Sequence, residues 1–195
     1  MAGKLDGKRI AILATDGVEE AELVRPRDAV TAEGARVDVV SLKDGAIQTM
    51  NHDLEPASTI EVDLAAAQAS PADYDALILP GGTVNADRLR MDGGVLSFVQ
   101  EIVRAGKPVG VICHGPWTLI DAGVVEGRTL TSYPSLRTDL TNAGAKWVDE
   151  EVVTDEGLVS SRNPGDLDAF CSTIVEEFAA GSARKPPHER RVSTT

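Results

Sequence analysis

A short apolar run leads directly into a cysteine near the middle of the 195-residue chain, and it constrains the fold more than any other feature. Residues 108–112 are β-branched and apolar enough to form a strand of a parallel sheet that is covered on both faces. A helix is expected from Gly115 to about Asp121, with Gly123 ending it. The pattern predicts a strand, a sharp turn at Cys113 and a helix, as in an α/β fold.

Cys113 has two interpretations. It would lie at the carboxyl end of a strand and face a helix N-terminus, which stabilises a thiolate. The alternative is a small apolar residue at the end of a core strand. We favour the reactive cysteine. For Cys171 the core interpretation is preferred, because it shares an apolar helical face with Phe170 and Ile174.

Strands and helices alternate along most of the chain. We expect a helix after Asn163 and Pro164, which are typical of a helix start. The region after residue 43 is weaker, with a hairpin or bulge expected near Asp44 and Gly45. The other expected elements are strands over 9–15, 36–41, 75–80 and 128–132, helical segments over 19–33 (broken at Pro26), 83–104 and 135–142, and a hairpin over 146–160.

Composition sets limits on the class of protein. The formal net charge of −12 argues against a nucleic-acid surface, which needs clustered Lys and Arg. Only two cysteines are present and no apolar run is long enough to span a membrane, so we expect a cytoplasmic protein. We predict one domain over residues 1–180 and a basic tail over 181–195, which contains four Lys or Arg and one Glu.

A thiol catalyst also needs proton-transfer groups and donors for an oxyanion. The glycine turn after the neighbouring strand, at Gly82, and the backbone N–H of His114 could form an oxyanion hole. An acidic cluster follows the first strand and should reach the same sheet edge, but spacing alone does not choose among Glu19, Glu20 and Glu22. Scattered histidines and separated cysteines predict no metal, and no phosphate-binding glycine motif indicates a cofactor.

Four motifs together carry a resemblance to a known family. They are Ile112-Cys113-His114-Gly115-Pro116, Leu79-Pro80-Gly81-Gly82, Thr131-Ser132-Tyr133-Pro134 and Val159-Ser160-Ser161-Arg162. In this order they closely resemble the PfpI intracellular protease family of the DJ-1/PfpI superfamily, which has a class I glutamine amidotransferase-like fold. The resemblance spans about residues 8–180. It implies a flavodoxin-like three-layer sandwich, with a mostly parallel sheet, helices on both faces and a small β-hairpin.

The resemblance also implies roles for individual residues. Cys113 matches the nucleophile and His114 the histidine beside it, while Glu19 matches the acid that hydrogen-bonds the cysteine sulfur. The peptidase members complete the site with an acid from an adjacent subunit. Its best match is Asp87, which is one methylene shorter and follows an apparent one-residue insertion. Tyr133 matches a tyrosine near the site that could contact substrate; the alternative is an aromatic at the edge of the core.

These residues lead to alternative functions. We predict a stress-response thiol hydrolase, peptidase- or deglycase-like, that acts on peptides or on methylglyoxal adducts without a cofactor. The alternatives are an oxidative-stress sensor, in which Cys113 is oxidised to a sulfinic acid, and a chaperone. The expected partners are a peptide or small-molecule substrate and a second copy of the chain, because a site acid from a neighbour requires at least a dimer. No nucleic-acid or membrane partner is expected.

Overall fold

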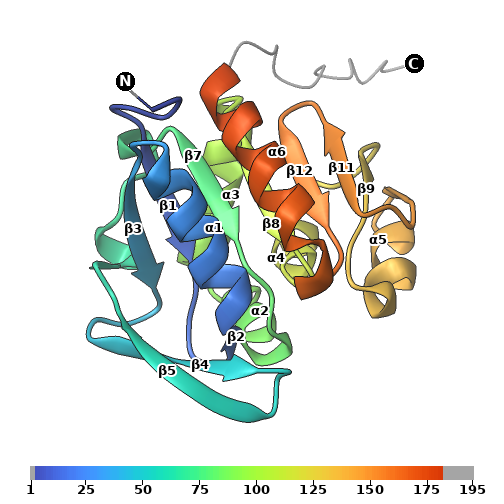
Figure 1. The fold of residues 1–195 in the computed structure, drawn as a ribbon. Coiled ribbons are helices and arrows are strands. Elements are labelled where there is room, and N and C mark those ends of the chain that lie inside the picture. The colour runs from blue at the N-terminus through green and yellow to red at the C-terminus, as the bar shows by residue number, and fades with distance from the viewer. Residues whose placement is uncertain (1–2, 182–195) are drawn as a thin grey trace.

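A seven-stranded sheet forms the centre of the molecule in the computed structural model, which describes residues 3–181 (Figure 1). Neighbouring strands are parallel except for one antiparallel pair at the edge, β11 with β12. In spatial order the strands are β11 (Val152–Asp155), β12 (Leu158–Ser161), β8 (Val109–Ile112), β7 (Ala76–Leu79), β1 (Arg9–Leu13), β3 (Arg36–Ser41) and β6 (Leu64–Ala65).

Helices cover both faces of this sheet. Figure 1 shows α1 and α6 side by side on one face. The helices are α1 (Glu20–Ala32), α2 (Thr83–Leu89), α3 (Gly93–Arg104), α4 (Pro116–Asp121), α5 (Arg137–Asn142) and α6 (Leu167–Ala180). Residues 3–181 also contain four short 3-10 turns between these elements: η1 (Ala66–Gln68), η2 (Pro71–Asp73), η3 (Pro134–Leu136) and η4 (Pro164–Asp166).

The central strands divide the apolar core into two parts. Side chains alternate across a strand, so Ile10 and Ile12 of β1 pack with α1 and α6, whereas Ala11 and Leu13 pack on the side of α2 to α5. Both faces are therefore buried, which explains why these strands are continuously apolar. The predicted three-layer α/β sandwich is confirmed.

A smaller sheet lies beside the edge of the main one (Figure 1). It contains β2 (Val18–Glu19), β4 (Ala46–Asn51) and β5 (Glu55–Glu61). The β4–β5 pair is the small hairpin that was expected, but it turns at His52 and Asp53, which have φ of 54° and 62°, and not at Asp44-Gly45. A further short pair joins β9 (Thr129–Leu130) to β10 (Lys146–Trp147).

The first helix also differs from expectation. No break occurs at Pro26, and α1 continues from Glu20 to Ala32. Pro26 is buried with Leu23 and Val30 on the face that packs on the sheet. Packing of this face compensates for the backbone hydrogen bond that proline cannot donate.

Candidate active site

The predicted elbow is present at Cys113. Strand β8 ends at Ile112, the chain turns at Cys113 with a φ of 61°, and α4 begins at Pro116. A positive φ is unfavourable for a residue with a Cβ, so neighbouring structure must hold it. The N–H of Cys113 donates to the carbonyl of Ser161 (3.1 Å), and its carbonyl accepts from the N–H of Tyr133 (2.9 Å). The end of β12 (Leu158–Ser161) and the loop segment that follows β9 thus hold the turn.

Glu22 supplies the carboxyl that meets the sulfur. It lies in the first turn of α1, is fully buried, and interacts with the Cys113 thiol. Its Oε2 accepts a hydrogen bond from the N–H of Gly81 (2.8 Å). Its Oε1 has no oxygen or nitrogen partner in the described part of the chain. The carboxyl is therefore anchored through one oxygen to the turn after β7.

The prediction that Glu19 contacts the sulfur is wrong. Glu19 precedes α1 and belongs to β2, so it points to the small sheet. Its carboxylate accepts from the backbone N–H groups of His52 (3.2 Å) and Asp53 (3.3 Å). Residues three apart share a face only where both are helical, and Glu19 lies outside the helix. Its role is to hold the β4–β5 turn at the rim of the site.

Burial raises the pKa of Glu22 to about 8, although the hydrogen bonds from Gly81 and Cys113 lower it. Glu22 is consequently neutral at neutral pH, and its O–H can donate to the sulfur. Burial also raises the pKa of the Cys113 thiol, and a charged Glu22 raises it further, while the N–H groups of Gly82 and His114 lower it. A protonated Glu22 removes the opposing charge and adds a donor, which favours the thiolate.

The ring of His114 reaches the sulfur, a point that the sequence left open. Its Nδ1 lies 3.2 Å from Sγ of Cys113, and its Nε2 lies 3.4 Å from Oγ of Ser135. The ring stacks on Tyr133 at a centroid distance of 4.7 Å and makes an edge-on contact with the Trp117 ring at a centroid distance of 5.3 Å. Burial lowers the pKa of His114, with an opposing effect from Asp53, so the imidazole is neutral and able to accept a proton.

Two backbone N–H groups face the sulfur, those of Gly82 and His114. They are the groups that the sequence suggested for an oxyanion hole. Gly82 has a φ of 85°, and a Cβ there would lie 2.3 Å from the carbonyl oxygen of Gly17. At Gly81 a Cβ would lie 2.4 Å from Oε2 of Glu22 and 2.6 Å from Cβ of Cys113. Only glycine lets this turn approach the elbow so closely.

These groups open onto a cavity of about 320 Å³. Tyr133 lies on its wall with 40% of its surface exposed, where it is available to a ligand. The substrate-contact role of Tyr133 stays a prediction. The cavity is lined by Glu19, Glu22, His52, Asp53, Gly82, Thr83, Cys113, His114, Tyr133 and Pro164.

Asp87 does not line this cavity. It lies on the exposed side of α2, whereas Asn85 and Ala86 are buried. Its predicted contribution across an interface stays a prediction. Asp53 was not anticipated, and it lies on the cavity wall, where its carboxylate accepts from the N–H (2.7 Å) and hydroxyl (2.9 Å) of Thr83.

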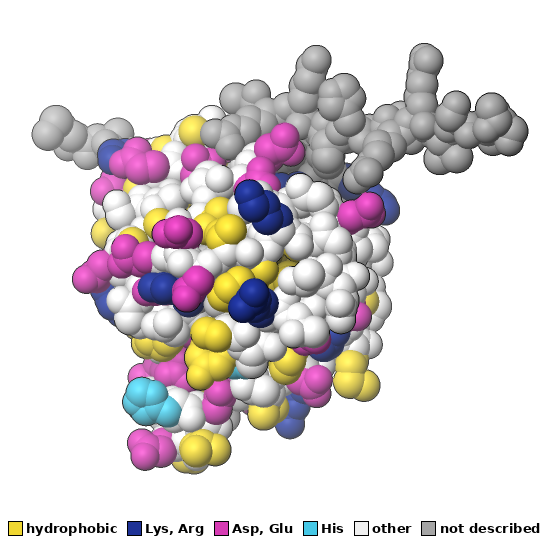
Figure 2. Space-filling view, turned by 90° about the vertical axis from the view of Figure 1, so that its right-hand side faces the viewer, with side chains coloured by type: hydrophobic (Ala, Val, Ile, Leu, Met, Phe, Trp, Pro, Cys, Tyr) yellow, Lys and Arg dark blue, Asp and Glu magenta, His cyan; other side chains and the backbone are white. Residues whose placement is uncertain are grey.

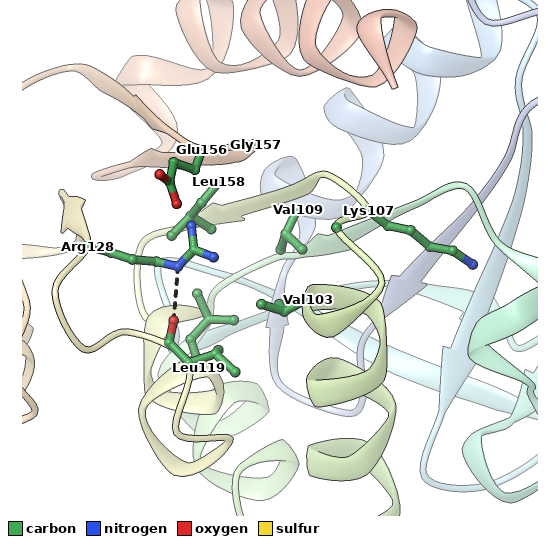
Figure 3. A pocket seen from close by; sticks show the side chains of 10 residues that line it. Val103, Lys107, Val109, Leu119, Arg128, Glu156, Gly157 and Leu158 are labelled. Atoms are coloured by element: carbon green, nitrogen blue, oxygen red, sulfur yellow. Dashed lines mark hydrogen bonds between the residues drawn. The ribbon is translucent and has the colours of Figure 1, made fainter. Parts of the chain in front are cut away.

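A second cavity, at the opposite end of the central strands, has a volume of only about 20 Å³ (Figure 3). It borders Val109, the first residue of β8, and Arg128, which donates from Nε to the carbonyl of Val124 (3.1 Å). This volume is sufficient for about one water molecule. The larger cavity at Cys113 is therefore the candidate active site.

Neither a metal centre nor a membrane span is found in residues 3–181. No group of three His, Cys, Asp or Glu side chains in this range is arranged to hold a metal ion. In the same range, no helix has the length and apolarity needed to cross a membrane. The basic tail predicted over residues 181–195 lies almost wholly outside the described residues.

A flavodoxin-like sandwich with a buried cysteine at a strand-to-helix elbow defines a class of α/β proteins. Within that class, the chain belongs to the DJ-1/PfpI family, whose model matches residues 8–177. The resemblance seen in the sequence motifs is confirmed.

Curated relatives and solved structures agree with this family. A deglycase of Pyrococcus abyssi is 44% identical over 86% of this chain and 98% of its own length. Protein/nucleic acid deglycase 2 of Escherichia coli is 42% identical over 84% of this chain and 93% of its own. The crystal structure of Drosophila melanogaster DJ-1beta has a TM-score of 0.80 and 30% identity, covering 88% of this chain and 90% of that one.

Proposed function

We propose that this protein is a cysteine-dependent deglycase, a thiol hydrolase of the stress response that acts on methylglyoxal adducts. The observation that carries the proposal is the placement of a neutral carboxyl, Glu22, and a neutral imidazole, His114, against one sulfur on a cavity wall. The names of the relatives support the choice of glycated substrates, since several are deglycases. The same addition step could begin peptide hydrolysis, for which the acid matched by Asp87 would have to come from an adjacent subunit.

The first chemical step follows from the geometry. Nδ1 of His114 accepts the thiol proton, and Sγ of Cys113 adds to the carbonyl carbon of the adduct. A C–S bond forms while the carbonyl π pair moves onto oxygen. The N–H groups of Gly82 and His114 stabilise the resulting oxyanion. Glu22 donates to the sulfur before the attack and so increases the thiolate fraction.

The test compares the two cysteines. Cys113→Ser and Cys171→Ser are each incubated with the methylglyoxal adduct of an amino-acid amine, and release of the free amine is followed by NMR. We expect Cys113→Ser to lose turnover and Cys171→Ser to retain it, because Cys171 lies on α6 and outside the cavity. Equal turnover by wild type and Cys113→Ser would refute the cysteine mechanism.

One observation also favours a redox sensor. The protonated carboxyl of Glu22 beside Sγ could stabilise a sulfinate, formed when the thiol takes two oxygens from two peroxide molecules and releases two waters. Peroxide should then add two oxygens to Cys113 much faster than to Cys171, and Glu22→Leu should slow the reaction. Mass spectrometry of both cysteines measures the rates, and equal oxidation of the two would argue against a sensor.

A further inference from the structure

The charge of the cavity wall indicates which adducts the site can accept. Two carboxylates, those of Glu19 and Asp53, line the cavity beside the buried Glu22. None of the ten lining residues is Lys or Arg. The nearest basic residue in sequence to the wall residue Pro164 is Arg162, and its guanidinium is paired with Asp149 and Asp166. The wall is thus acidic without a compensating cation of its own.

The carboxylates of Glu19 and Asp53 can each accept further hydrogen bonds from a ligand. Each oxygen of Glu19 accepts one backbone N–H, and each oxygen of Asp53 accepts one hydrogen bond from Thr83. A carboxylate oxygen can accept two hydrogen bonds, so at each oxygen one acceptor position is left. These existing bonds also fix the carboxylates in place before any substrate arrives, so little ordering is needed on binding.

The charges on this wall act on the buried reacting groups as well as on the cavity. The charges of Glu19 and Asp53 raise the pKa of Glu22, and Asp53 raises that of His114. Their negative potential therefore extends to the reacting sulfur and its neighbours.

The rest of the molecule adds to this potential at longer range. The chain has a formal net charge of −12, and acidic side chains are spread over the face shown in Figure 2. Such a field attracts cations and repels anions during diffusion to the site. On the cavity wall, the partly exposed ring of Tyr133 offers a flat surface on which a planar cation can stack.

We propose that the site selects adducts on cationic carriers, such as the guanidinium and ammonium side chains of proteins, over adducts on anionic carriers such as nucleotides. This inference rests on the proposed deglycase function and specifies its substrate class. Asp53 is the residue that would contact the carrier cation, with Glu19 holding the turn on which Asp53 lies. The addition step at Cys113 is the same for every carrier.

The experiment measures kcat/KM for three methylglyoxal hemithioacetals of similar size. Their thiol carriers are 2-(dimethylamino)ethanethiol, 2-methoxyethanethiol and 3-mercaptopropionate, which are cationic, neutral and anionic. At low salt we expect the cationic adduct to be preferred over the anionic one by about tenfold, and the ratio to fall towards one as salt screens the field. A glycated arginine peptide should likewise be preferred over a glycated nucleotide.

Asp53→Asn tests the residue assignment. The amide can keep both contacts to Thr83, because the Thr83 hydroxyl can accept where it now donates. We expect the cation-to-anion ratio to fall at least threefold, roughly the effect of one exposed charge pair. Glu55→Gln removes one exposed negative charge outside the cavity and should leave the ratio unchanged. If Asp53→Asn only disturbed the local structure, kcat/KM would fall by the same factor for all three adducts.

The outcomes separate the two proposals. If all three adducts are turned over equally and Cys113→Ser abolishes the reaction, the charge preference is wrong while the deglycase proposal stands. If no adduct is turned over, the deglycase proposal itself fails. If the preference exists but Asp53→Asn does not change it, Asp53 is not the selecting residue. Equal turnover of the peptide and the nucleotide would also overturn the preference.

Discussion

Nδ1 of His114 lies 3.2 Å from Sγ of Cys113, although the two residues are adjacent in the chain. In an extended strand, neighbouring side chains point to opposite faces of the sheet and do not meet. The positive φ of Cys113 turns the backbone and brings the two side chains to the same cavity. One unusual dihedral angle thus creates the proposed nucleophile and base pair.

Replacing the imidazole should separate its base role from its packing role. His114→Phe retains a ring that can stack on Tyr133 and keeps the backbone N–H at residue 114. We expect kcat to fall by about 10²–10⁴, the usual range for loss of a general base. Ser135→Ala removes only the 3.4 Å contact to Nε2 and should change kcat by a few-fold. If His114→Phe keeps wild-type kcat, the base lies elsewhere.

The rate should depend on pH in a bell-shaped manner. Below neutrality the rate rises with pH as His114 loses its proton, and burial places this rise below the ordinary histidine pKa of 6.5. Above a pH of about 8 the rate falls, because Glu22 ionises and places a negative charge beside the sulfur. Glu22→Gln should retain the acid limb and lose the alkaline one, as measured by kcat/KM from pH 5 to 10. A persistent alkaline limb in Glu22→Gln would exclude this assignment.

Stability should also depend on pH through Glu22. The unfolded chain releases this proton near pH 4.5, whereas the folded protein keeps it until about pH 8. Between these two pH values the folded state binds more protons than the unfolded state. The stabilisation by protonated Glu22 is therefore fully present below pH 4.5, and it is lost as the pH rises towards 8. At 1.36 kcal/mol per pKa unit the loss is about 5 kcal/mol. Denaturant unfolding across this range should show a smaller decrease for Glu22→Gln than for wild type.

The turn after β7 should not tolerate a side chain. A Cβ at Gly81 would clash with both Glu22 and Cys113, so Gly81→Ala must displace one of the reacting groups. We expect a loss of about 1–3 kcal/mol in unfolding free energy, typical of overpacking, together with a large loss of activity. Gly93→Ala is the matched control, since a Cβ at the start of α3 meets nothing within 4 Å. Unaltered activity in Gly81→Ala would show that the turn can move.

Parts of the site could be predicted from local sequence, because local sequence determines them. The apolar run before Cys113 was sufficient to predict the elbow, and the glycines at 81 and 82 were sufficient to predict the turn that faces it. The choice between Glu19 and Glu22 could not be made this way, since it depends on where α1 begins. Glu20 is the first helical residue, so only Glu22 of this pair lies in the helix and points beneath the elbow.

Asp53 could not have been found by motif reasoning either. It lies in a hairpin turn that packs against the site through contacts between residues 30 or more positions apart. The sequence signal for a turn was stronger at Asp44-Gly45, where Gly45 indeed has a positive φ but precedes β4. Tertiary contacts with Glu19 and Thr83, and not turn propensity, determine where Asp53 lies.

The proposed reactive group is assembled from three distant parts of the chain. Glu22 comes from α1, Gly81 from the turn after β7, and Cys113 from the turn after β8. A chain that has not yet paired these strands carries an ordinary thiol with neither its carboxyl nor its backbone donors. Chemical labelling of Cys113 during refolding would therefore report when the sheet closes, and a damaged, partly unfolded molecule would lose its reactivity before it lost all of its helices.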